Sequence, residues 1–142
     1  MTTVSQLLDA KGHEVTSVEA DDTVLTALQV MERDDIGALV VLDKGRLVGM
    51  FSERHYARKV FIKGKSSPNT HVREVMDENV VVTRPDHTVE ECMAIVTEKR
   101  VRHLPVVDDG ELVGLISIGD LVKSIISDQQ FVIEQLEHYI RA

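Results

Sequence analysis

The amino-acid sequence predicts an α+β fold that consists of two copies of one β-α-β-β-α unit, with an N-terminal helical turn and an extra C-terminal helix. The first observation is an internal repeat, in which residues 45–49 (GRLVG) return as residues 110–114 (GELVG). The second is that helical and strand-like apolar patterns alternate at the same offsets in both copies. Because a repeat this short cannot bury a hydrophobic face alone, we expect the copies to pack together, with two related clefts.

Composition limits the class of protein. The chain has 142 residues, of which 43% are hydrophobic and 28% charged, as is typical of one globular body. A formal net charge of -8 argues against general nucleic-acid binding, which needs clustered Lys and Arg. We see no signal peptide and no apolar run near the roughly 20 residues of a membrane span, so we expect a cytoplasmic protein with no membrane contact. The single cysteine, Cys92, is expected to be a small buried hydrophobe.

The first helix of each unit is predicted by an apolar stripe of helical period. The stripes begin at Val24 and Val89, and Thr23 and Thr88 stand directly before them, where a side-chain cap is available. Both helices are therefore expected to be amphipathic. The stripes consist of Val24, Ala27, Leu28 and Met31 in the first copy and of Val89, Cys92, Met93 and Val96 in the second.

A β-hairpin and a second helix follow in each unit. A short, nearly continuous apolar run predicts a strand covered on both faces. A turn comes next, in which glycine supplies the positive φ angle, and a second strand returns. The following helix begins at Ser52 or Ser117. The strands and turns are predicted at residues 38–42, 43–46 and 47–51 in the first copy, and at 104–107, 108–111 and 112–116 in the second.

Other segments lie outside this repeated core. Residues 4–8 and 72–76 are predicted as matching lead-in helical turns, but their offset is 68, which places three extra residues of the first copy around residues 10–13. Residues 64–69 have the composition of a linker. Residues 132–140 carry an apolar stripe of a C-terminal helix, which we expect to cover the module or a partner. We therefore divide the chain into residues 1–66, 67–127 and 128–142.

The order of these elements, written twice, resembles a tandem pair of cystathionine-β-synthase (CBS) domains, often called a Bateman module. The resemblance spans almost the whole chain and rests on residues 36–41, 47–54, 102–106 and 112–121. It implies two CBS repeats packed sheet to sheet. It further implies a regulatory module that binds an adenosyl ligand, such as AMP, ADP, ATP, NAD or S-adenosylmethionine, between the repeats. We therefore expect a homodimer that modulates an unidentified protein partner.

The second helix of the second copy begins with Ser117, and Asp120 follows three residues later. Such a pair can cap a helix start, and the same helix end offers N–H groups and a positive dipole to a phosphate. Capping alone would explain both residues. The resemblance implies a further role, in which Asp120 binds the ribose hydroxyls and Ser117 lies on the phosphate side.

The first copy departs from this pattern, because His55 occupies the position that matches Asp120. A neutral imidazole engages about one donor and one acceptor, whereas a carboxylate can accept from both ribose hydroxyls. We therefore expect two clefts that differ, with the His55 cleft weakened or empty. Altered ligand choice, with protonated His55 favouring a phosphate, and replacement without effect both stay open.

The resemblance also implies that a nucleotide held by one copy meets the strands of the other. Gly37 and Ala38 would leave room for the ligand there and Lys11 would supply charge, whereas Arg102 and His103 either bind phosphate or form a solvated strand end. Carried over residue by residue, the Asp120 cleft contains Ser117, Asp120, Lys11, Gly12, Val15, Gly37 and Ala38. The His55 cleft contains Ser52, Arg54, His55, Val81, Arg102 and His103.

Motifs for other chemistry are missing from the sequence. The remaining histidines lack metal-site spacing, no phosphate loop or dinucleotide motif occurs, and the serines lack the motif of an activated nucleophile. We expect no enzyme, no metal and no obligatory cofactor. The favoured function is a regulatory module that binds adenine nucleotide and senses energy or redox state. The alternative is a structural or interaction module that dimerises and binds a partner protein with little or no nucleotide affinity.

Overall fold

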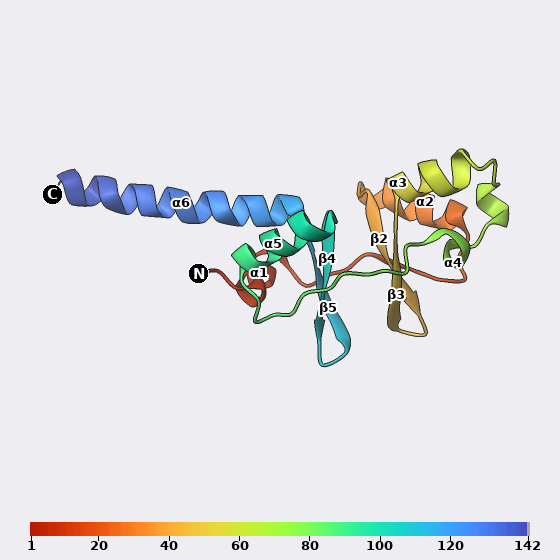
Figure 1. Ribbon diagram of the computed structural model, residues 1–142, viewed down its shortest axis with the longest axis horizontal. Helices are drawn as coiled ribbons and strands as arrows, with labels where there is room; N and C mark the ends of the chain where they lie inside the picture. Colours follow the sequence, from red (N-terminus) through yellow and green to blue (C-terminus); the bar gives the residue numbers. More distant parts are fainter. Residues whose placement is uncertain (142) are drawn as a thin grey trace. The chain divides into compact units, whose positions relative to one another are not determined.

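The computed structural model describes residues 1–141 (Figure 1). Its contacts gather into two compact units. The first-repeat unit is Glu14–Val80, and the second-repeat unit combines Met1–His13 with the chain from Val81 onwards. Ala142, the last residue of the predicted segment 128–142, lies outside the described residues.

The first-repeat unit contains a three-stranded sheet. β1 (Ser17–Glu19) pairs in parallel with β2 (Ala38–Asp43), and β2 pairs antiparallel with β3 (Arg46–Ser52). Between β1 and β2 lies α2 (Val24–Asp34), whose start is capped by the hydroxyl of Thr23. These elements confirm the predicted helix, the predicted hairpin and the side-chain cap.

The helix predicted from Ser52 is irregular. Its first turn, α3 (Glu53–His55), is capped by Ser52 and continues as a π-helix over Tyr56–Phe61. π-helical turns are rare and frequently occur at functional sites. A short 3-10 helix, Ser67–Asn69, lies in the predicted linker, and α4 (Val72–Val75) is the predicted lead-in turn.

The second-repeat unit repeats this arrangement with fewer strands. It begins with α1 (Val4–Lys11), and α5 (Val89–Lys99) is the predicted amphipathic helix. β4 (His103–Asp108) and β5 (Glu111–Ser117) form an antiparallel hairpin, and α6 (Ile118–Arg141) follows directly. The extra residues predicted in the first copy lengthen α1 to eight residues, against four in α4.

The first strand of the second copy is reduced to a single parallel bridge of Thr83 to β4. In the first copy, the N–H groups of Val40 and Ala20 donate across the pair of β1 and β2 at 3.4 and 2.8 Å. Their counterparts 65 residues later are Pro105 and Pro85. Because proline has no N–H, two hydrogen bonds of the parallel ladder cannot form, and the strand shrinks to a bridge.

The two hairpin turns confirm the predicted role of glycine and add a second constraint. Gly45 has a φ of 80° and Gly110 a φ of 78°, and the residues before them, Lys44 and Asp109, also have positive φ, at 52° and 51°. Two consecutive positive φ angles define the type I′ turn, whose twist matches that of the flanking strands.

The lead-in helices cross between the repeats. α1 precedes the first repeat in the chain but belongs to the second-repeat unit, whereas α4 precedes the second repeat and belongs to the first-repeat unit. Equivalent backbone bonds hold them, from the N–H of Val4 to the C=O of His87 and from the N–H of Val72 to the C=O of Asp22, both 2.8 Å long. The predicted boundary at residue 66 follows the order of the chain, whereas the contacts place each lead-in helix in the unit of the other repeat.

The repeated glycines Gly49 and Gly114 have a packing role in this exchange. A Cβ on Gly114 would lie 2.6 Å from the side chain of Leu8, and a Cβ on Gly49 would lie 2.6 Å from that of Met76. Leu8 and Met76 are equivalent at the offset of 68 that relates the lead-in segments. Because each glycine has no side chain, a side chain of the lead-in helix can pack against the returning strand of the hairpin.

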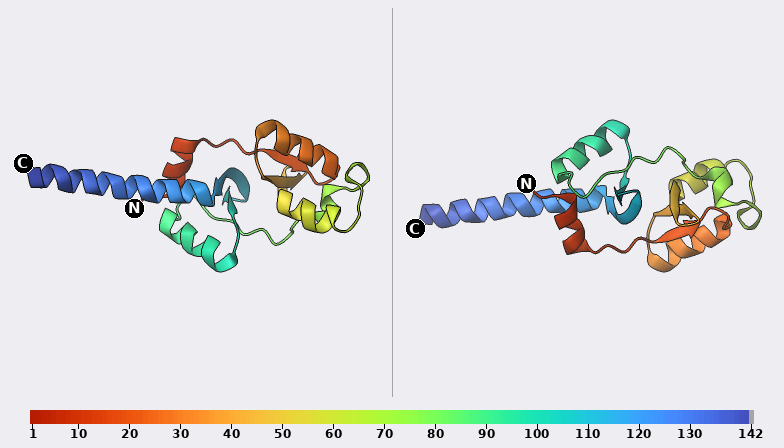
Figure 2. Two further views of the ribbon diagram at one scale, coloured as in Figure 1. Left: turned by 90° about the horizontal axis from the view of Figure 1, so that it is seen from above. Right: turned by 90° about the horizontal axis from the view of Figure 1, so that it is seen from below.

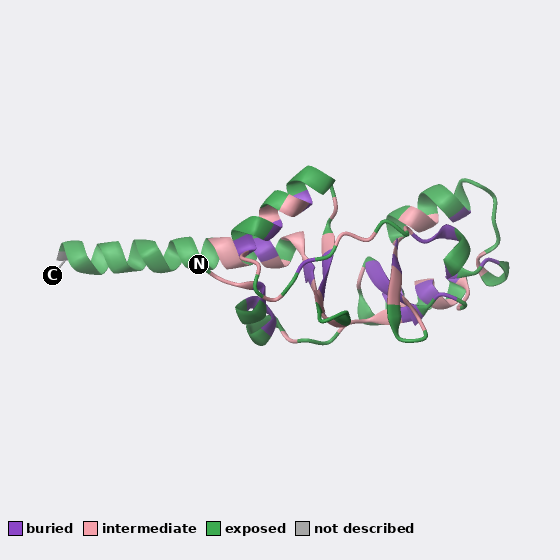
Figure 3. Ribbon diagram, turned by 60° about the horizontal axis from the view of Figure 1, so that its bottom comes forward, coloured by how far each residue is buried: buried purple, intermediate pink, exposed green. Residues whose placement is uncertain are grey.

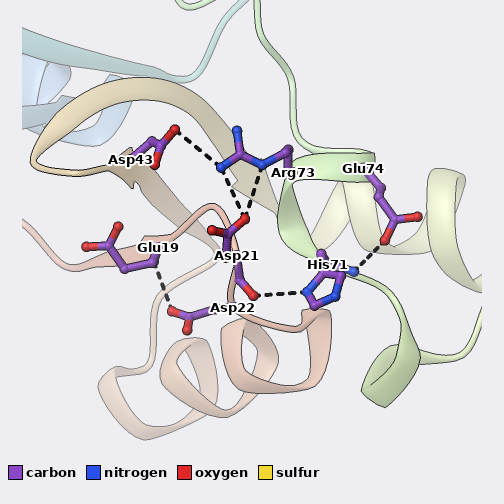
Figure 4. Close-up of polar contacts among 7 residues, drawn as sticks. All are labelled: Glu19, Asp21, Asp22, Asp43, His71, Arg73 and Glu74. Atoms are coloured by element: carbon purple, nitrogen blue, oxygen red, sulfur yellow. Dashed lines mark hydrogen bonds and ion pairs between the residues drawn. The ribbon is translucent and has the colours of Figure 1, made fainter.

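A cluster of charged side chains fixes α4 to the first-repeat unit (Figure 4). The guanidinium of Arg73 donates from Nε and Nη2 to Oδ1 of Asp21, at 3.2 and 3.1 Å, and lies 3.3 Å from Oδ2 of Asp43. The Nδ1 atom of His71 lies 2.9 Å from the C=O of Asp21. These contacts join the lead-in turn to the end of β2 and to the loop before α2.

α6 is one continuous helix of 24 residues, so the second helix of the second repeat and the predicted C-terminal helix are a single element. Its first turns pack in the core of the second-repeat unit, where Leu121 is fully buried. The helix then extends past α1 and α5 (Figures 1 and 2). Residues 126–140 are all exposed (Figure 3), so this part of α6 does not cover its own unit.

Each unit has its own apolar core. The largest buried side chain, that of Phe51, belongs to the first-repeat unit. Cys92 is buried in the second-repeat unit, as predicted, and burial raises the pKa of its thiol. Within residues 1–141, none of the helices combines the length and the apolar character that crossing a membrane requires.

Candidate functional site

The predicted cap of Ser117 and Asp120 is formed at the start of α6. The Ser117 N–H donates to Oδ2 of Asp120 at 2.9 Å, and the Asp120 N–H donates to Oγ of Ser117 at 3.1 Å. This reciprocal pair satisfies two N–H groups of the helix start. Capping is thus one role of both side chains, and it fixes the Asp120 carboxylate at the positive end of a long helix.

Lys11, from the extra turn of α1, reaches this carboxylate. Its ammonium lies 2.5 Å from Oδ2 of Asp120 and 2.5 Å from the C=O of Leu115. The side chains are 35% and 23% exposed, so the ion pair is partly shielded from water. Burial acts to raise the pKa of Asp120, but the hydrogen bonds from Lys11 and Ser117 outweigh it and lower that pKa.

The two oxygens of Asp120 are therefore in different environments. All hydrogen bonds to its carboxylate that come from residues 1–141 end on Oδ2. Oδ1 receives none from this described part of the chain, although the side chain is only 23% exposed. A ligand hydroxyl can therefore bind Oδ1 without breaking the cap, and a second hydroxyl would compete with Lys11 for Oδ2.

Arg102 and His103 lie at the same end of the hairpin as Ser117. His103 is the partner of Ser117 in the register of β4 and β5, and the C=O of Arg102 accepts the N–H of Ile118 at 3.0 Å. Burial lowers the pKa of His103, and the positive charge of Lys11 lowers it further, so the imidazole favours its neutral form. Arg102 is exposed. Lys11 and His103 thus lie near the Asp120 carboxylate, and Arg102 adds an exposed positive charge near His103.

His55 reproduces the cap of Asp120 in the first-repeat unit. The Ser52 N–H donates to Nδ1 of His55 at 3.1 Å, and the His55 N–H donates to Oγ of Ser52 at 3.2 Å. Burial lowers the pKa of His55, and the charge of Lys59 adds to this effect. Because Nδ1 must be unprotonated to accept, the ring is neutral in this cap. The histidine thus preserves the helix start without the negative charge of a carboxylate.

Gly37 and Ala38 lie beside this histidine cap. Ala38 pairs with Ser52 across β2 and β3, and the C=O of Gly37 accepts the N–H of Glu53 at 3.0 Å. The Glu53 carboxylate occupies part of the space that the missing side chain of Gly37 leaves, since a Cβ there would lie 2.9 Å from its Oε1. Gly37 lines a cavity of about 320 Å³ with Glu53, Glu32 and Asp35. Its three carboxylates would repel a phosphate.

The remaining predicted site residues are placed by local structure. Gly12 ends α1 with a φ of 112°, a backbone conformation that favours glycine. Val15 and Val81 are half-buried in loops, and Val81 packs against the core of the second-repeat unit. Arg54 is exposed in α3. Of the predicted residues, the second-repeat unit thus brings together Lys11, Arg102, His103, Ser117 and Asp120, and the first-repeat unit brings together Gly37, Ala38, Ser52, Arg54 and His55. The predicted grouping across the repeats stays a prediction.

A second feature near Asp120 was missed by the sequence reasoning. A groove of about 580 Å³ lies between α1 and α6, and Lys11 and Asp120 both line it. Its volume is in the range of small-molecule sites, roughly 300–1,000 Å³. Its other polar side chains come from segments that the sequence did not relate to each other, which is why no motif indicated it. They are Thr2, Gln6, Lys123, Ser124, Ser127 and Asp128.

The described residues contain no cluster of three or more His, Cys, Asp or Glu side chains that could hold a metal ion. The chemistry available near Asp120 is instead that of hydrogen bonding and of anion binding. One carboxylate oxygen, one serine hydroxyl and a lysine are gathered at the N-terminal end of α6, where the backbone C=O of Arg102 accepts the N–H of Ile118. Such a set suits a ligand that carries both hydroxyl and anionic groups.

Comparison with known proteins identifies both repeats. Residues 5–61 and 72–127 each match the CBS domain family. The mitochondrial CBS domain-containing protein CBSX3 of Arabidopsis thaliana is 35% identical over 149 residues, which cover 99% of this chain and 72% of the relative. YhcV of Bacillus subtilis, another CBS domain-containing protein, is 29% identical over 89% of each chain.

Solved structures agree with these sequence matches. A putative signal-transduction protein with CBS domains from Burkholderia ambifaria is 48% identical, with a TM-score of 0.86 over 90% of this chain and 96% of that chain. A more distant CBS domain pair, 22% identical with a TM-score of 0.79, shares the fold over 90% of this chain and 98% of its own. That protein was solved in complex with 5′-methylthioadenosine and S-adenosyl-L-methionine. The chain therefore belongs to the CBS domain family, as a protein with two CBS domains.

Proposed function

We propose that this protein is a regulatory module that binds an adenosyl ligand, with the ribose on Asp120 and the anionic part near Lys11, Arg102 and the start of α6. CBS domain pairs are commonly regulatory and bind ligands. The observation that carries the proposal is the Asp120 carboxylate, which is held by a cap on one oxygen and offers the other to a ligand.

The charges near Asp120 favour a ligand with phosphate groups. Lys11 and Arg102 are cations, and a bound anion would counteract the effects of burial and of Lys11 that lower the pKa of His103. AMP, ADP, ATP and NAD all combine a ribose diol with phosphate. The distant relative in complex with two adenosyl compounds that lack phosphate supports the adenosyl part of the proposal alone.

We propose that the histidine cap of the first-repeat unit binds such a ligand more weakly. His55 offers a neutral ring whose Nδ1 already accepts from Ser52, so it cannot replace a carboxylate that accepts from two hydroxyls. Nearby, Glu53, Glu32 and Asp35 give the cavity beside Gly37 a negative charge. The first feature disfavours the ribose of a nucleotide there, and the second disfavours its phosphate. If the histidine cap instead preferred a different ligand, that altered choice would count against ranking it simply as the weaker of the two sites.

The ligand would act by shifting which surfaces are presented to a partner, since a ligand changes an equilibrium only by binding one state better than another. We further propose that the protein is a homodimer, is not an enzyme and modulates an unidentified protein partner. Its predicted location is the cytoplasm, although the Arabidopsis relative is named as mitochondrial.

A second function has its own support. The ammonium of Lys11 already neutralises Asp120, and residues 126–140 of α6 are exposed. Both observations fit a structural or interaction module with little or no nucleotide affinity. In that case α6 would be the working surface and the cap of Ser117 and Asp120 would serve only the helix.

Calorimetric titration with AMP, ADP, ATP, NAD and S-adenosylmethionine separates the two functions. The regulatory proposal expects at least one of these ligands to bind with a Kd below about 1 mM, a binding free energy of roughly -4 kcal/mol. Absence of binding by all five at that level would overturn it and favour the interaction module. Adenine without ribose is the control ligand, because it cannot use Asp120.

A further inference from the structure

The exposed part of α6 carries a continuous apolar face. At 100° per residue, eight apolar side chains and one glutamine fall within an arc of about 140° along the helix. Val132 is 54% exposed, Leu136 56% and Ile140 80%. Phe131 lies on the opposite side of the helix. The face consists of Val122, Ile125, Ile126, Gln129, Val132, Ile133, Leu136, Tyr139 and Ile140.

Such a face requires a partner. A helix in a protein owes most of its stability to the packing of its apolar face. This segment is also rich in the β-branched residues Ile and Val, which favour helix less than Ala or Leu. Within the part of the chain that the structure describes, every residue from 126 to 140 is exposed (Figure 3).

We propose that this apolar face binds the same face of a second copy of the chain, with the two α6 helices antiparallel. The pattern fits, because three apolar positions in every seven are typical of helices that pack in a bundle. Seven of the side chains are at least 39% exposed. At about 70 Å² of remaining surface each, two copies would bury on the order of 1,000 Å², the lower bound of a specific interface.

The charges beside the face select the antiparallel orientation. Lys123 and Glu137 flank the apolar face on the same side and lie seven residues before and after Gln130. An antiparallel pair centred on Gln130 therefore sets Lys123 of each copy against the partner's Glu137, which gives two ion pairs. In a parallel pair in register, each lysine would meet a lysine and each glutamate a glutamate.

Shifting the centre by half a residue, to a point between Gln130 and Phe131, keeps Lys123 within one residue of the partner's Glu137 and matches the apolar side chains. Positions whose numbers add up to 261 then oppose one another along the seam. Gln129 then meets an apolar residue near the centre of the seam. The opposed pairs are Val122 with the partner's Tyr139, Gln129 with the partner's Val132, and Ile125 with the partner's Leu136.

This contact differs from the homodimer expected for the family. The two matched CBS domains end at residue 127, whereas most of the proposed face lies beyond that residue. None of its residues belongs to the proposed ligand site. The pairing of α6 can therefore be tested independently of nucleotide binding.

Distances between spin labels, measured by double electron–electron resonance, test the contact directly. A nitroxide is attached at Gln130→Cys in the full chain, where Cys92 is fully buried and protected from the label. The proposal expects a short distance between the two labels. Leu136→Asp should remove it, with a rise in the dissociation constant of about 100-fold, because each pair loses two buried leucines. His138→Asp, on the opposite side of the helix, is the matched control and should leave the distance unchanged.

Two further measurements test the orientation. Labels at His138→Cys should be about 23 Å apart along the axis in an antiparallel pair, since about fifteen residues of rise separate them, but adjacent in a parallel pair. Lys123→Glu and Glu137→Lys should each weaken pairing about 5-fold, and the double variant should restore it. A Gln130 label distance that is long or insensitive to Leu136→Asp overturns the contact. A short distance at position 138, or no rescue by the double variant, overturns the antiparallel orientation.

Discussion

Replacing Lys11 by methionine should have opposite effects on two related ligands. The ammonium of Lys11 now occupies Oδ2 of Asp120, where a ribose hydroxyl would also bind, and it is the cation nearest to that carboxylate. Adenosine has to compete with Lys11 and gains nothing from it. AMP competes as well, but its phosphate can take up the displaced ammonium. Lys11→Met should therefore strengthen adenosine binding and weaken AMP binding.

The magnitudes follow from the geometry of the contact. A partly exposed ion pair contributes about 0.5–1 kcal/mol, so its removal should tighten adenosine binding about 2- to 5-fold. A charge-assisted hydrogen bond to phosphate contributes about 1.5–3 kcal/mol, of which part is offset by the released Asp120, so AMP binding should weaken about 5-fold. Loss of the bonds to Asp120 and to the C=O of Leu115 should lower the free energy of unfolding by about 1–2 kcal/mol.

Isothermal titration of both ligands into the wild type and the variant measures these effects, and thermal unfolding measures the change in stability. Lys99→Met is the matched control, because it removes the same charge from an exposed position of the same unit. Tighter or unchanged AMP binding by Lys11→Met would refute the assignment of Lys11 to the phosphate. Weaker adenosine binding would refute the claim that Lys11 competes for Asp120.

Three further predictions concern packing, pH and the second cap. Gly114→Ala should lower the free energy of unfolding by about 1–3 kcal/mol, measured by thermal unfolding, because the new Cβ would lie 2.6 Å from the buried Leu8 side chain. Gly119→Ala is the control and should not destabilise the protein, since its nearest contact, at 3.5 Å, is an ordinary one. The free energy of unfolding should fall as the pH drops below about 6.5, because both histidines have a lowered pKa in the folded protein and take up protons more easily in the unfolded chain. Replacing His55 and His103 by asparagine should reduce this pH dependence, as measured by chemical denaturation. His55→Asp should raise the number of AMP molecules bound per chain, and an unchanged stoichiometry would show that the histidine does not limit binding there.

The sequence predicted the repeated elements because both local signals and spacing agreed. The stripes that begin at Val24 and Val89 became α2 and α5, and the hairpins formed where glycine allowed positive φ. The reduction of one strand to a bridge could also have been read from Pro85 and Pro105, but only once their register against β4 was known. Register is a property of pairing, which a single strand does not encode.

The candidate site was only partly predictable. The reciprocal cap of Ser117 and Asp120 follows from three-residue spacing, which a helix start fixes. The contact of Lys11 with Asp120 joins residues 109 positions apart. It depends on α1 belonging to the second-repeat unit rather than to the repeat that follows it in the chain. No local pattern contains that exchange. The position of Glu53 beside Gly37 was not foreseen either, because it depends on the register in which β2 pairs with β3.

The central claim is that the carboxylate of Asp120, and not the imidazole of His55, holds the ligand. It is tested most directly by the Kd of AMP for two single variants, Asp120→Ala and His55→Ala, measured by calorimetry on proteins that unfold at a similar temperature. Both substitutions delete a side chain that accepts a backbone N–H at a helix start, while Asp120→Ala also removes the ion pair with Lys11. We predict that Asp120→Ala weakens AMP binding at least about 10-fold, the loss of roughly one charge-assisted hydrogen bond, while His55→Ala changes it less than about 2-fold. Equal weakening by the two variants would contradict the account.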